Sequence, residues 1–195
     1  MRVIFAAACL ALCSTSALSA EFGLGVSAKS DDGWIYVPIE INDKYRVEPS
    51  VRYQSSEFSY SDPAGMSSDA FRRQESDTLE LGIGVFRLMK VAESAQFYFG
   101  GRVAYVDTKT TLGSTITYIP GPIISTQSET SQDGYRIGPA IGFEYLFGEH
   151  FSIGAEASYT FLDLEGESGV GSSFRTEIEQ KSNGTDTQFI FRYRF

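Results

Sequence analysis

Few residues in this chain have the types and spacing that enzymatic catalysis requires. Ester hydrolysis needs a nucleophile beside a general base, and that base is commonly a histidine. The only histidine, His150, follows Glu149 in a short glycine-containing reversal between two apolar segments. No serine is spaced to act as its nucleophile. The sequence therefore predicts no catalytic residues, and His150 is interpreted as a solvated turn residue.

Metal and cofactor sites are not indicated by the sequence either. Both cysteines, Cys9 and Cys13, fall within residues 1–20, and the acidic residues between Glu165 and Glu179 do not follow the spacing of a calcium-binding loop. The glycine pairs at 23–25 and 82–84 are not followed by a helix, which a phosphate-binding loop would need. We expect no metal ligands and no cofactor.

The ionisable residues that do form a pattern are arginines and glutamates at alternate positions within apolar segments. In a β-strand, this alternation places the charges on one face and the apolar side chains on the other. Buried charges persist only when they are paired, so an enclosed charged face predicts a network of ion pairs. We interpret this network as structural, with a conducting path as the alternative. Its expected members are Arg46, Glu48, Arg52, Glu80, Arg102, Arg136, Glu144, Glu156, Arg192 and Arg194.

The last seven residues, 189–195, carry the clearest strand pattern. Phe189, Phe191, Tyr193 and Phe195 alternate with polar or aliphatic residues, so their rings would share one face. Such a face invites aggregation on a soluble edge strand but meets lipid on a membrane barrel. The pattern resembles the C-terminal assembly signal of bacterial outer-membrane β-barrels. That resemblance implies that these four residues engage the barrel-assembly machinery.

The first 20 residues resemble a cleaved secretory signal. A positive start at Arg2 precedes a short apolar run and a region of small residues, and the run is too short to span a bilayer. Residues 21–195 would then form one domain. Cleavage of this signal would remove one cation, Arg2, and no acidic residue, so the net charge would change from −9 to −10. An acidic balance of this size argues against nucleic acid as a partner.

Alternation and glycine-containing polar breaks divide the remaining chain into eight expected strands. The later connections between them alternate between short turns and long polar loops, as in barrels with short periplasmic turns and longer extracellular loops. The third, fifth and sixth strands exceed the roughly 9 to 11 residues needed to cross a membrane, so we expect these three to project as a small sheet above it. The strands are 22–29, 34–41, 45–60, 76–89, 95–110, 132–147, 151–164 and 189–195, and the long loops are 61–75, 111–131 and 165–183.

The sequence thus predicts an all-β, eight-stranded antiparallel up-and-down transmembrane β-barrel. A soluble ligand-binding barrel is the alternative, but charged residues mixed with glycine would make an unusual soluble surface and suit a cramped interior. The chain resembles the small eight-stranded outer-membrane barrels, such as the OmpA transmembrane domain and the opacity-type surface proteins. The hairpin 142–156, with an inward glutamate in each arm, is its most family-like segment.

The resemblance implies export to the bacterial outer membrane and contact with its lipid and lipopolysaccharide. Because the sequence offers loops and no catalytic set, we expect a non-enzymatic surface protein that serves envelope integrity or adhesion. An extracellular protein or matrix component would be its ligand. A narrow, porin-like ion-conducting barrel is the second interpretation, and a lipid-modifying enzyme is the third.

Overall fold

The computed structural model describes residues 20–28, 33–64, 68–118, 121–170 and 174–195. The expected secretory signal lies outside these residues except for Ala20, and so does most of the opening connection at 30–33. No helix in the described part of the chain is long and apolar enough to cross a membrane.

The described residues form a single antiparallel sheet in which the second and third strands both pair with the first and the fourth, and each strand from the fourth to the eighth pairs with the next in the sequence. The first strand also pairs with the last, from Gly23 opposite Arg194 to Ala28 opposite Phe189, and this pairing closes the sheet into a ring. The second and third strands share one position in the ring, so the predicted eight-stranded up-and-down barrel is confirmed. The strands are β1 (Ala20–Ala28), β2 (Ile35–Tyr36), β3 (Ile39–Ile41), β4 (Tyr45–Ala64), β5 (Ser68–Ala92), β6 (Ala95–Tyr118), β7 (Ile123–Phe147), β8 (Phe151–Val170) and β9 (Phe174–Arg194).

The expected strand over 34–41 is interrupted at Val37 and Pro38, which separate β2 from β3. Proline has no N–H to donate to the ladder, which explains why the regular pairing stops there. The chain still follows the wall, because Val37 N donates to Pro49 O at 2.9 Å and Pro38 O accepts from Gly23 N at 2.9 Å.

Side chains alternate between the two faces of the wall, as the period of a β-strand dictates. Along β7, for example, Ile141, Phe143 and Tyr145 are exposed on the outside while Gly142 and Glu144 are buried inside. A small apolar cluster of Phe86, Leu88, Tyr98 and Ala140 lies within the ring. The outside of the barrel is therefore apolar, and its interior holds both charged and aromatic side chains.

Tight reversals join the strands at the end of the barrel where β9 ends. Asn42 and Asp43 both have positive φ (54° each), the geometry of a two-residue hairpin turn with the twist of the adjoining strands. Gly148, with φ of 71°, serves the same purpose between β7 and β8. The short turns that the sequence predicts are present at this end of the barrel.

The three segments expected to be long loops are instead mostly strand, and this part of the interpretation needs correction. Residues 61–75 lie largely in the β4–β5 hairpin, 111–131 in β6 and β7, and 165–183 in β8 and β9. Their polar composition is typical of irregular structure. In the fold, however, their backbone groups continue the ladder of the neighbouring strands, with pairs such as Tyr60 opposite Arg72 and Ser114 opposite Thr126.

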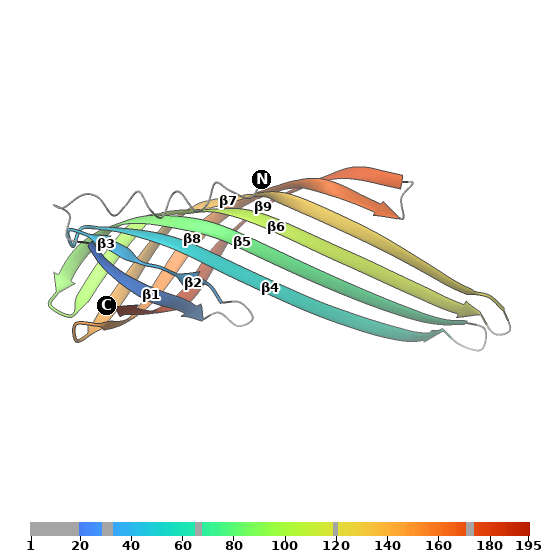
Figure 1. Ribbon diagram of the computed structural model, residues 1–195, viewed down its shortest axis with the longest axis horizontal. Coiled ribbons are helices and arrows are strands. Elements are labelled where there is room, and N and C mark those ends of the chain that lie inside the picture. Colours follow the sequence, from blue (N-terminus) through green and yellow to red (C-terminus); the bar gives the residue numbers. More distant parts are fainter. Residues whose placement is uncertain (1–19, 29–32, 65–67, 119–120, 171–173) are drawn as a thin grey trace.

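The expectation of a projecting sheet is confirmed and applies to more strands than we predicted. β4 to β9 continue together well beyond the end of β1 and β2 (Figure 1). β1 pairs with β9 only as far as Ala28 opposite Phe189, and β2 pairs with β4 only as far as Ile35 opposite Val51. Beyond these pairs no described residue closes the wall between β4 and β9. The inner face of the barrel thus continues onto the concave face of an open sheet, about 40 Å long on β4.

Candidate functional site

All ten residues of the expected charge network lie on the inner face of the barrel, where they form three layers along its axis. Arg46 belongs to the layer nearest the short turns. The guanidinium of Arg46 donates to Glu40 at 3.0 and 2.6 Å and to Glu144 at 2.7 Å. Glu144 also accepts from Gln96 at 3.0 Å and from Ser152. Arg194 closes this layer, with Nη2 at 3.2 Å from a carboxylate oxygen of Glu40.

The middle layer links residues that are far apart in the sequence. Glu48 accepts a hydrogen bond of 2.8 Å from Arg192 and one of 2.7 Å from Arg102. Arg102 also binds Glu156 through two nitrogens, each at 2.8 Å. The ring of Tyr98 lies within 5.4 Å of the guanidinium carbons of Arg46 and Arg192, a cation–π arrangement that adds to the stability of the layer.

The third layer is nearest the projecting sheet and centres on Glu80. This carboxylate accepts hydrogen bonds from Arg52 and from Arg136, the latter at 3.2 and 3.1 Å. The guanidinium of Arg52 lies 5.1 Å from the ring centre of Trp34. A cavity of about 40 Å³ between Trp34, Tyr36 and Arg102 lies just inside, which is room for a few water molecules.

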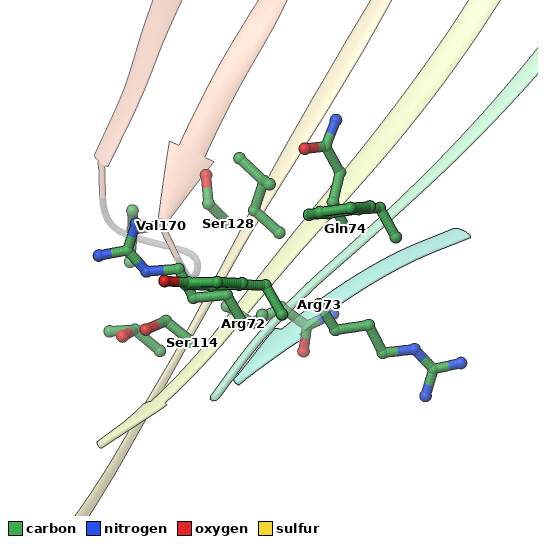
Figure 2. A pocket seen from close by; sticks show the side chains of 12 residues that line it. Arg72, Arg73, Gln74, Ser114, Ser128 and Val170 are labelled. Carbon is green, nitrogen blue, oxygen red and sulfur yellow. The ribbon is translucent and has the colours of Figure 1, made fainter. Parts of the chain in front are cut away.

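A second hollow lies on the concave face of the projecting sheet, far from the charge network. It has a volume of about 520 Å³, within the usual range for small-ligand sites. Figure 2 shows that Arg72 extends across it toward Val170, whereas Arg73 points to the other side of the sheet. We call this hollow the concave pocket. Arg73 borders it with its side chain pointing away, and the other lining residues are Phe58, Tyr60, Arg72, Gln74, Leu112, Gly113, Ser114, Thr126, Gln127, Ser128 and Val170.

The convex face of the same sheet is strongly acidic. Glu165 lies directly opposite Glu179, and Glu167 lies opposite Glu177 in the β8–β9 ladder. Like charges opposite each other destabilise a sheet, and nearby cations offset this repulsion here. Arg175 contacts Glu167 at 2.9 Å, and a hydrogen bond to Glu179 raises the pKa of Lys181 above its ordinary value.

No protein-family model matches the sequence, and no curated protein matches it. Solved structures do match the fold. A major outer membrane protein from Thermus thermophilus superposes with a TM-score of 0.55 at 10% identity, over 91% of this chain and 100% of that one. The outer membrane protein OprG from Pseudomonas aeruginosa gives 0.50 at 15% identity, over 90% of this chain and 94% of that one. At these identities the likeness establishes the fold.

This chain has the fold of an outer-membrane β-barrel. Rings and aliphatic side chains cover the outer surface of the closed part, including Leu81 and Ile83 on β5 and Phe161 on β8, where a soluble protein would place polar groups. Such an apolar outer surface is suited to contact with lipid. The acidic convex face begins only where the projecting sheet leaves the ring, so the change of polarity marks the boundary of the hydrocarbon layer.

The four expected assembly residues lie on or next to the last strand of the outer-membrane barrel. Phe189 and Tyr193 are exposed on its outer face, and Phe191 is half-buried. Phe195 follows the strand and donates its N–H to Phe22 O at 2.9 Å. The rings therefore lie where lipid or another protein can reach them, and their role in assembly stays a prediction.

His150 lies in the turn before β8, where its ring contacts the end of β9. Its ring stacks on Tyr193 at 5.8 Å between centroids, and its Nδ1 is 3.2 Å from Arg194 O. No side chain in the described part of the chain forms a hydrogen bond with the His150 ring. Within the same residues, no group of three or more histidine, cysteine, aspartate or glutamate side chains could hold a metal ion.

Sequence reasoning missed several residues that complete the site. Glu40 is buried and ion-paired, and its alternation with Tyr36 on the inner face was a signal that could have placed it in the network. Gln96, Tyr98 and Ser152 were not predicted as partners because uncharged residues carry no pattern of their own. The concave pocket was missed because its lining falls largely within segments that the sequence predicts as loops.

Proposed function

We propose that this outer-membrane barrel is a non-enzymatic surface protein that holds a ligand-binding sheet outside the cell. The observation that carries the proposal is the concave pocket, which lies on the part of the sheet that extends beyond the closed ring. Binding sites are usually placed on elements that a rigid scaffold positions. Adhesion to an extracellular partner is the function that this arrangement supports best.

The interior of the barrel supports a scaffold role more than a transport role. Arg46, Glu48 and Glu144 are fully buried and paired with one another, so ions would have to displace these pairs to pass. Moving one member of a buried pair leaves an uncompensated charge, which is strongly unfavourable. The ion-conducting alternative therefore requires a rearrangement of the network. The same rigidity favours a contribution to envelope integrity as a second role.

The enzymatic alternative lacks a group to carry out the reaction. A lipid-modifying enzyme needs a nucleophile and a base within hydrogen-bonding distance at the membrane surface. His150 lies at the rim with the short turns, at the opposite end of the barrel from the concave pocket. We infer that lipid and lipopolysaccharide surround the barrel and are not substrates of it. We also infer that the barrel-assembly machinery binds the barrel through β9.

The test is to shorten the projecting sheet and keep the barrel. Replacing residues 57–75 and 112–128 by tight turns removes the concave pocket and leaves the layers around Glu48 and Glu80 unchanged. We expect the shortened protein to retain the altered electrophoretic mobility of a folded, unheated barrel, and cells that carry it to lose adhesion to extracellular matrix and host-cell surfaces. Unchanged adhesion and an unchanged envelope would refute the proposal, and discrete conductance steps in a planar bilayer would favour the porin-like alternative.

A further inference from the structure

The concave pocket has the composition of a site for a polar ring, beginning with two aromatic side chains. Phe58 and Tyr60 lie two residues apart on β4, so both rings face the concave side. They are 67% and 49% exposed, which is unusual for rings on a monomeric surface. On its other side β4 pairs with no described residue at this level, because its pairing with β2 ends at Val51. A ligand can therefore approach the rings from the open edge.

The polar side chains in the pocket are free to bind a ligand, in contrast with those just below it. Nearer the barrel, hydroxyl groups pair across the strands, with Ser76 and Thr110 at 3.1 Å and Thr130 and Ser168 at 2.9 Å. In the pocket, the side chains of Gln74, Ser114 and Thr126 make no hydrogen bond with any described residue. Ser128 donates to Gly169 O at 3.1 Å and keeps its acceptor capacity. These groups could bind the hydroxyls of a ligand.

The charge of the pocket comes from Arg72. Its neighbour Arg73 forms ion pairs on the convex face of the sheet, with Glu57 at 3.0 Å and Glu75 at 2.6 Å. Arg72 forms no ion pair with any carboxylate among the side chains that the structure describes, which leave out 62–69. A guanidinium binds a carboxylate through two parallel hydrogen bonds, so a free arginine at the edge of an apolar hollow suits one such group.

The acidic surroundings limit how much negative charge a ligand can carry. The convex face of the same sheet presents Glu57 and Glu75 beside the pocket and further carboxylates on β8 and β9. A polysulfated chain would be repelled by these groups, whereas one carboxylate bound by Arg72 would be screened from them. A fatty acid would satisfy Arg72 and the rings but would leave the free amide and hydroxyl groups without partners.

We propose that the concave pocket binds a sugar residue that carries a single carboxylate. The apolar face of the sugar ring would rest on Phe58 and Tyr60, its carboxylate would bind Arg72, and its hydroxyls would meet Gln74, Ser114 and Ser128. The inference rests on the proposed surface-binding function and gives it a ligand class: the acidic end of a glycan.

The experiment measures binding of small probes to the full chain folded in detergent micelles, by ligand-observed NMR. The probes are glucuronate and N-acetylneuraminate, with glucose as the neutral sugar and laurate as the fatty acid. We expect both acidic sugars to bind about tenfold more tightly than glucose, because each gains a charge-assisted contact. Arg72→Gln should remove this difference, and Tyr60→Ala should weaken the binding of every sugar.

Arg73→Gln is the matched control, because Arg73 adjoins Arg72 but points to the convex face. It should leave sugar binding unchanged, and an equal loss in both arginine variants would overturn the assignment of Arg72. Equal affinity for glucuronate and glucose, or binding of laurate alone, would overturn the ligand class. If no sugar binds while adhesion still depends on the projecting sheet, the ligand class is wrong and the surface-binding function stands.

Discussion

Arg102 and Glu156 face each other across the barrel interior and are joined by two hydrogen bonds of 2.8 Å each. The carboxylate of Glu156 also accepts from Gln188 at 2.9 Å and from Tyr98 at 3.2 Å. Four hydrogen bonds from residues on two other strands thus converge on one buried carboxylate. The wall of the barrel cannot twist or slip at this level without breaking several of these bonds, so the pair fixes the relative positions of β6, β8 and β9.

Glu156→Gln should destabilise the barrel by about 3 kcal/mol, because it leaves the half-buried Arg102 with only part of its countercharge. The measurement is urea unfolding in lipid vesicles, followed by fluorescence of the single tryptophan, Trp34. Glu179→Gln is the control, since Glu179 is exposed on the convex face and its replacement should change the free energy of unfolding by less than about 0.5 kcal/mol. Equal effects of the two substitutions would contradict a structural role for the network.

Gly142 leaves the space that the ring of Tyr98 occupies. A Cβ at position 142 would overlap the hydroxyl end of that ring. Gly142→Ala should therefore cost about 2 kcal/mol through overpacking. Combined with Tyr98→Ala it should cost less than the sum of the two single changes, because the clash is removed. Gly184→Ala, with no atom within 4 Å of its added Cβ, is the neutral control, and strict additivity would refute direct contact.

The aromatic end of the chain should govern assembly more than stability. Removal of the ring in Phe195→Ala should lower the amount of folded barrel in cells several-fold and leave unaided refolding in vesicles nearly unchanged. Phe161→Ala, which removes another exposed outer ring on β8, serves as the control and should not reduce assembly in cells. The folded fraction is read from the mobility of unheated samples. Equal behaviour of the two variants would mean that the terminal ring is only a lipid contact.

Trypsin digestion of intact cells, followed by mass mapping, should distinguish the edge strand β9 of the projecting sheet from its inner strand β5. Lys181 lies on β9, whose far side pairs with no described residue at this level, so cleavage there should come first. Arg72 and Arg73 lie on β5 between two paired strands and should be cut slowly. Wall residues such as Arg102 should resist cleavage. Rapid cleavage at Arg72 would show that the hairpin is open in solution.

Much of the site was accessible from alternation alone. A charge at every second position of an apolar segment must share a face with the other charges, so Arg46 and Glu48 could be assigned to one side of the wall without knowing their partners. The partners themselves could not be read from the sequence. Arg192 binds Glu48 across 144 positions of the chain, and Arg102 binds both Glu48 and Glu156. Closure of the ring brings these groups together.

The sequence by itself determined the class of fold and the two faces of each strand, because the two-residue period separates rings from charges and rings on the outside require lipid. Tertiary structure decided where the strands end. The segments 61–75, 111–131 and 165–183 are largely polar and contain glycine or proline, so alternation of apolar and polar residues does not mark them as strand. They extend because each finds a neighbour in register that satisfies its backbone hydrogen bonds. The concave pocket exists only because of that pairing, which brings Phe58, Arg72 and Ser128 from three strands to one face.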